Sequence, residues 1–117
     1  MIYMASIPQK QISDAYYECN RDPGEWIYFG RGYRMMYNNY IYKLVHYDTE
    51  ICQINEKTKK IKVDGYSVSD VMAINSLLYH VSPKKRVYSA NGRIYLEGEG
   101  PRYQKKRKDA TMHPFGL

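Results

Sequence analysis

The sequence has few of the residues that build metal sites, disulfide frameworks or membrane spans. Its 117 residues include two cysteines, Cys19 and Cys52, with no CxxC spacing, and three scattered histidines. Zinc sites use such residues in close pairs, so we expect no metal, no cofactor and two free thiols. No apolar run approaches the roughly 20 residues that cross a bilayer, and no N-terminal segment resembles a signal peptide. These absences predict a cytoplasmic protein without a membrane partner.

Catalytic motifs are missing as well. Nucleophilic catalysis needs a serine or cysteine beside a histidine and an acid, and helix capping explains the one dense serine cluster, Ser67 and Ser69. Gly30-Arg31-Gly32 lacks the helix and the Lys-Ser/Thr pair that follow in phosphate loops. Glu97 and Glu99 flank a strand end, where solvation explains them better than acid–base work or magnesium binding. We expect no catalytic residues and no enzyme.

Tyrosine, in contrast, is abundant. The chain has 14 tyrosines against two phenylalanines and one tryptophan, and six of the tyrosines lie between residues 28 and 47. A tyrosine ring combines an apolar body with a polar tip, which suits half-buried sheet faces and the rims of binding surfaces. This composition favours a binding protein.

The positive charge is concentrated near the C-terminus. Residues 101–117 contain five cations and one carboxylate, a net +4 of the formal +6, which leaves 13 cations and 11 carboxylates for residues 1–100. Residues 98–117 begin with Gly98-Glu99-Gly100-Pro101 and lack apolar periodicity, so they predict a basic, flexible tail. The tail ends in the short apolar segment 112–117, which could dock on a partner.

A length of 117 residues allows one domain with one modest core. Residues 1–25 predict an N-terminal extension with a short helix over residues 9–20. Short β-rich runs follow, and the pair Asn38-Asn39 favours a tight turn between the second and the third, which predicts an antiparallel meander. These runs cover residues 26–30, 33–37, 40–46, 50–54 and 59–63.

One strong helix and a closing hairpin complete the predicted domain, residues 26–97. Ser67 and Asp70 have the spacing of a capping box, and the helix should run to about Val81 before Pro83 stops it. Asn91-Gly92 predicts a hairpin between residues 86–90 and 93–97. We therefore expect an α+β fold, in which a twisted antiparallel sheet, a meander plus the C-terminal hairpin, carries one main helix packed on a face.

Residues 38–97 resemble a known family. The resemblance rests on four segments: Gly65-Tyr66-Ser67-Val68-Ser69-Asp70, Ala73-Ile74-Asn75, Arg86-Val87-Tyr88 and Gly92-Arg93-Ile94-Tyr95-Leu96-Glu97. This half of the chain resembles a family of small, uncharacterised β-rich proteins of phages, plasmids and integrated elements in gut-dwelling Gram-positive bacteria. The resemblance implies a mobile-element origin and carries over no catalytic residue. By analogy, small non-enzymatic proteins of such elements often bind host machinery, and inhibitors of CRISPR nucleases are a prominent class.

Basic and aromatic residues together indicate two kinds of partner. Arginines and lysines such as Arg93 can contact phosphates while nearby tyrosines stack on unpaired bases. The run Tyr33-Arg34-Met35-Met36-Tyr37 concentrates residue types enriched at protein interfaces, although tyrosines that merely pack a sheet would give the same pattern. A nucleoprotein partner would present phosphate and protein surfaces together.

These observations lead to one expected function and one alternative. We expect a non-enzymatic phage or mobile-element protein that binds and inhibits a host nucleic-acid-targeting complex, such as a CRISPR effector nuclease. The alternative is a nucleic-acid-binding protein that acts through its basic tail and tyrosine-rich sheet. A homodimer that pairs edge strands also stays open, because only charge guards those edges. The expected contact residues are Arg31, Tyr33, Arg34, Tyr37, Lys84, Lys85, Arg86, Lys105, Lys106, Arg107 and Lys108.

Overall fold

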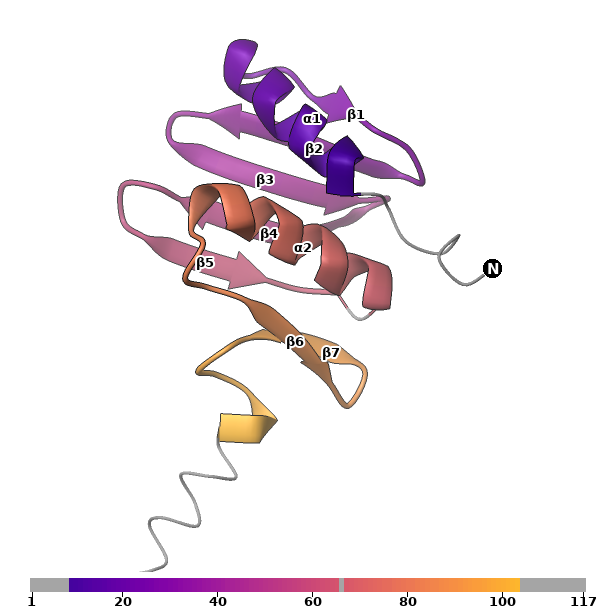
Figure 1. Cartoon of the computed structure of the whole chain (residues 1–117), viewed down its shortest axis with the longest axis vertical. Helices are drawn as coiled ribbons and strands as arrows, with labels where there is room; N and C mark the ends of the chain where they lie inside the picture. Colours follow the sequence, from indigo (N-terminus) through magenta and orange to yellow (C-terminus); the bar gives the residue numbers. More distant parts are fainter. Residues whose placement is uncertain (1–8, 66, 104–117) are drawn as a thin grey trace, which may run out of the picture.

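Figure 1 shows the computed structural model of the chain, in which residues 9–65 and 67–103 are described. An N-terminal helix precedes a five-stranded sheet, which is followed by a second helix and a hairpin. In chain order the elements are α1 (Gln9–Arg21), β1 (Ile27–Tyr28), β2 (Tyr33–Asn38), β3 (Ile41–His46), β4 (Thr49–Asn55), β5 (Lys60–Val63), α2 (Val68–Val81), β6 (Val87–Ala90) and β7 (Arg93–Leu96).

The predicted fold class is confirmed. Strands β1 to β5 form one antiparallel sheet in sequence order, and β6 pairs with β7 in a separate two-stranded sheet. Helix α2 packs on the five-stranded sheet, as expected for the main helix, and the Asn91-Gly92 turn of the hairpin has positive φ at both positions. No helix in the described ranges is long and apolar enough to cross a membrane.

The turn between β2 and β3 lies one residue later than expected. Asn38 pairs with Ile41, so the two-residue loop is Asn39-Tyr40 instead of Asn38-Asn39. Both loop residues have positive φ, 50° and 69°, which the tight hairpin turn requires. Tyr40 therefore adopts a conformation that sequence preference would assign to asparagine or glycine.

Helix α1 belongs to the same core as the sheet. Both helices lie on one face of the five-stranded sheet (Figure 1). Ile12, Ala15 and Cys19 recur at spacings of three and four on α1 and are fully buried against the core. The helix predicted within an N-terminal extension thus supplies part of the domain's core, and each large side chain buried there contributes about 1.5–3 kcal/mol.

The start of the predicted tail packs against the hairpin. The Tyr88 hydroxyl donates a hydrogen bond of 2.6 Å to the carbonyl of Glu99, and the Arg102 guanidinium lies 4.2 Å from the centre of the Tyr88 ring. Gly100 fits closely between Tyr88 and Tyr95, where an added Cβ would come within 2.5 Å of both side chains. The segment expected to separate the tail is therefore docked as far as residue 103, and the rest of the tail lies outside the described residues.

Candidate functional site

Strand register divides the side chains of the five-stranded sheet between two faces. Met35 pairs with Leu44, which pairs with Cys52, and this row is buried under the helices. Successive residues of a strand point to opposite sides, so the neighbouring rows face away from the helices. One of those rows runs from β2 to β5 and consists of Met36, Lys43, Gln53 and Lys62.

We call the side away from the helices the open face, because no helix of residues 9–65 or 67–103 covers it. Its side chains are exposed or half-buried, with the single exception of Val45. Four cations stand there against one carboxylate, which makes this face basic. The open face consists of Tyr28, Arg34, Met36, Asn38, Ile41, Lys43, Val45, Glu50, Gln53, Asn55, Lys60 and Lys62.

Arg34 is held in position on the open face. Its guanidinium lies 4.9 Å from the centre of the Trp26 ring, and it donates a hydrogen bond of 3.0 Å to the carbonyl of Tyr47. That bond uses one of its five N–H donors, and no other hydrogen bond of this guanidinium is formed in the described part of the chain. A fixed guanidinium with donors to spare suits recognition of phosphate or carboxylate groups.

The open face combines charge with aromatic surface. Lys43 and Lys62 lie in one row two strands apart, and neighbouring strands are about 4.8 Å apart, so their charges cover a span of about 10 Å. Tyr28 on the edge strand β1 is 73% exposed. Basic side chains with accessible aromatic rings are the combination that tracks a nucleic-acid backbone and stacks on unpaired bases.

Of the predicted contact residues on β2, only Arg34 lies on the open face. Tyr33 is one position away, points to the helix side and is only 1% exposed. Its expected role as a direct contact is wrong, because the alternation of the strand buries it where its hydroxyl donates 2.8 Å to Oδ1 of Asp70. Burial raises the pKa of Tyr33, with the bond to Asp70 adding to the shift.

Tyr37 also belongs to the helix side. It is half-buried against Tyr42, with the ring centres 4.3 Å apart, and its hydroxyl donates 2.8 Å to Oε1 of Glu56. This hydrogen bond to a carboxylate is the main reason that the pKa of Tyr37 is raised to about 12. The Tyr37 side chain thus has a structural role near the end of β2, where it contacts Tyr42 and Glu56.

The remaining predicted residues lie elsewhere. Arg31 is exposed in the turn before β2, where φ is 51°, and its carbonyl lies 3.0 Å from Nε2 of His46. Lys84, Lys85 and Arg86 are exposed in the loop between α2 and β6, outside the five-stranded sheet. The cluster Lys105, Lys106, Arg107 and Lys108 lies outside the described residues.

The expected contact residues did not include Tyr28 or the other three cations of the open face, Lys43, Lys60 and Lys62. The alternation of Lys60 and Lys62 around Ile61 could have placed both lysines on one side of β5. The sequence alone does not predict the strand register. Three strand pairings, β2 with β3, β3 with β4 and β4 with β5, align this side of β5 with Lys43 and Arg34.

A second polar cluster joins the sheet to α2. Asp70 is buried, and its Oδ1 lies 2.8 Å from Nδ1 of His46 as well as from the Tyr33 hydroxyl. The Ser67 side chain accepts a bond from the Asp70 amide, so the predicted cap is formed, while the Asp70 carboxylate turns to the sheet. Both ring nitrogens of His46 lie within hydrogen-bonding distance of protein oxygens, Oδ1 of Asp70 and the Arg31 carbonyl, so this histidine links the sheet, the helix and the turn before β2.

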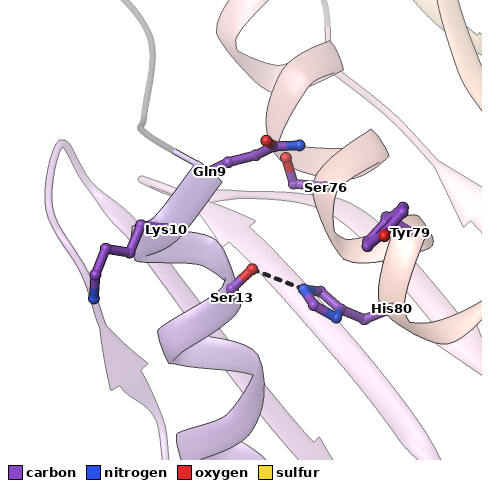
Figure 2. A pocket seen from close by; sticks show the side chains of 6 residues that line it. All are labelled: Gln9, Lys10, Ser13, Ser76, Tyr79 and His80. Carbon is purple, nitrogen blue, oxygen red and sulfur yellow. Dashed lines mark hydrogen bonds between the residues drawn. The ribbon is translucent and has the colours of Figure 1, made fainter.

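A third cluster lies between the two helices. Figure 2 shows the Ser13 hydroxyl directed at His80, with Oγ and Nε2 2.8 Å apart, beside a cavity of about 370 Å³. The His80 ring stacks on Tyr16 with 4.6 Å between centres. Within the described ranges no carboxylate is hydrogen-bonded to His80, so the pair lacks the third group that orients a catalytic histidine.

Metal binding and known relatives add no further assignment. Residues 9–65 and 67–103 contain no group of three or more His, Cys, Asp or Glu side chains that could hold a metal ion. Scans against protein-family models, curated proteins and solved structures found no match to this chain. The assignment of the open face as the candidate site therefore rests on its basic charge and its exposed aromatic surface.

Proposed function

We propose that this protein is a stoichiometric binding protein that attaches through the open face to a host nucleic-acid-targeting complex and inhibits it in the bacterial cytoplasm. The observation that carries the proposal is the basic open face, with Arg34, Lys43, Lys60 and Lys62 against Glu50. The resemblance of residues 38–97 to mobile-element proteins supports the inhibitory form, with a CRISPR effector nuclease as the expected partner class.

The composition of the open face favours a partner that is itself a nucleoprotein. Its cations suit phosphates, while Met36 and Tyr28 offer apolar and aromatic surface of the kind enriched at protein interfaces. A guide-loaded nuclease presents both kinds of surface at once. An inhibitor that contacts both would gain specificity from the protein part and rapid association from the charged part.

The alternative candidate is a protein that binds free nucleic acid. The fixed guanidinium of Arg34 and the exposed ring of Tyr28 on the same side favour this alternative, because together they suit an unpaired strand. Binding of that kind is dominated by phosphate contacts and weakens steeply with salt, whereas an interface with a large protein component weakens less.

The experiment that separates the two candidates is capture of partners by the tagged full chain from a bacterial lysate, with and without nuclease treatment. A defined nuclease subunit that is retained after digestion supports the inhibitor. Nucleic acid that is retained only before digestion supports the alternative instead. A variant with Lys43→Gln and Lys62→Gln tests whether the open face is responsible, since it should retain clearly less of the partner than the unmodified chain does.

A further inference from the structure

The outer side of α2 carries an unusual amount of exposed apolar surface. Val68, Met72 and Tyr79 are all exposed, and Tyr79 is 70% exposed. Their spacings of four and seven place them on one stripe of a helix with 3.6 residues per turn. Helix α2 contains no Lys, Arg or Glu, its single Asp, Asp70, is buried, and His80 is half-buried, so the helix itself sets no exposed charged side chain beside these apolar ones. We call Val68, Met72 and Tyr79 the α2 stripe.

A cavity suitable for an aromatic ring lies next to the α2 stripe. The cavity of about 370 Å³ is bounded by both helices, with Ser13 and Lys10 on α1 and Ser76, Tyr79 and His80 on α2. Figure 2 shows Tyr79 at one border of this cavity and the hydroxyls of Ser13 and Ser76 at another. Its polar groups can bond a tyrosine hydroxyl while the helices flank the ring, as amphipathic aromatic residues require at interfaces.

The projecting ring and the cavity stand side by side on one surface, which is the arrangement that a two-fold symmetric contact needs. In such a contact the same patch serves both copies, so the projection of each copy enters the cavity of the other. Charge favours the same geometry. The open face holds four cations and one carboxylate and would repel its own copy, whereas Lys10 at the helix layer is already paired with Asp14 at 2.9 Å.

We propose that the occupant of this surface is a second copy of the chain: the protein forms a two-fold symmetric dimer through the α2 stripe, with Tyr79 of each copy in the α1–α2 cavity of the other. The helix layers then meet in the middle, and the two open faces point outward. This inference is independent of the proposed partner, because the contact involves none of the open-face residues.

Sedimentation velocity of the full chain across micromolar concentrations tests this proposal without any partner. We expect a dimer for the unmodified protein. Tyr79→Lys should weaken the dimer by about 30-fold or more, as for a central aromatic contact, and Met72→Lys should weaken it too. Tyr28→Lys is the matched control, because Tyr28 is equally exposed at 73% but lies on the open face. That variant should dimerise like the unmodified protein.

Two outcomes would overturn the proposal. One is a monomer at every concentration of the unmodified protein. The other is a dimer that survives both Tyr79→Lys and Met72→Lys, as an edge-strand dimer through β5 would. Both substituted side chains are exposed, so circular dichroism should show unchanged folding, and a loss of dimer can then be assigned to the surface itself.

Discussion

The Tyr33 hydroxyl and the Asp70 carboxylate form a hydrogen bond of 2.8 Å that ties strand β2 to the first turn of helix α2. His46 on β3 lies at the same distance from the same oxygen. One buried carboxylate thus fixes the position of the helix over two strands. Strand alternation directs Tyr33 inward beside the positioned Arg34, and this bond satisfies its buried hydroxyl.

Replacing Tyr33 should reveal the strength of this link. Tyr33→Phe removes a donor to a buried carboxylate while keeping the ring, so we expect the free energy of unfolding to fall by about 2 kcal/mol. Tyr28→Phe, at an exposed position, should change it by less than about 0.5 kcal/mol. Urea unfolding of both variants measures the difference. Equal effects would mean that the Tyr33–Asp70 bond adds nothing to stability.

Two glycines near the C-terminal end of the described chain give a matched comparison. Gly98 and Gly100 have φ of 99° and 91°, so alanine is strained at both positions. A Cβ at Gly98 would meet nothing within 4 Å, whereas at Gly100 it would meet Tyr88 and Tyr95. Gly100→Ala should therefore cost about 1–3 kcal/mol more than Gly98→Ala in thermal unfolding. The same cost for both would contradict docking of this segment on the hairpin.

Alkaline pH should destabilise the protein. Burial raises the pKa of the Cys19 and Cys52 thiols from 9.0 to about 12. Between these pH values the unfolded chain releases protons that the folded chain retains. The contribution of the thiols to the free energy of unfolding is therefore fully present below about pH 9 and is lost as the pH rises towards about 12. Each thiol contributes up to about 1.4 kcal/mol per pH unit.

Urea midpoints under reducing conditions at about pH 8 and about pH 10.5 measure this effect. Cys52→Ala should lower stability at both values and flatten the decline between them, because it removes one of the two thiols. A decline of unchanged steepness in this variant would show that the thiols are not its cause.

The basic tail allows a test that needs no structure. Replacing Lys105, Lys106, Arg107 and Lys108 with glutamine removes four charges. If the tail contacts phosphates of the partner, affinity should fall and the salt dependence of binding should become shallower. Binding titrations at several salt concentrations measure both quantities. Unchanged affinity of this variant for the partner would show that these four residues are not part of the interface.

Local patterns were sufficient for much of the fold. The Ser67 cap, the stop before Pro83 and the Asn91-Gly92 turn lie within a few residues of the elements that they define, and α2 and the β6–β7 hairpin follow from them. The turn at Asn39-Tyr40 differed because the pairing of β2 with β3 placed a tyrosine at positive φ. Register there outweighed local preference.

The candidate site was harder to predict, because it depends on which side of each strand the helices cover. Tyr33 and Arg34 are adjacent in sequence and equally plausible as contacts, yet the sheet buries one and presents the other. Lys62 joins Lys43 only through the pairing of three strands, and a register shift between Leu44 and Val45, nearer the β3–β4 turn, sets which residue of β4 faces Lys43. Such alignment is a property of the assembled sheet.

The central claim is that the open face makes the contact with the partner, and one comparison of affinities tests it most directly. The partner retained by the tagged chain is titrated with the Lys43→Gln, Lys62→Gln variant and with a Lys10→Gln, Arg21→Gln variant, which removes the same charge from exposed positions on α1. We predict that the open-face variant binds about tenfold more weakly or worse, while the α1 variant binds like the unmodified protein. Equal affinity of the two variants would contradict the account.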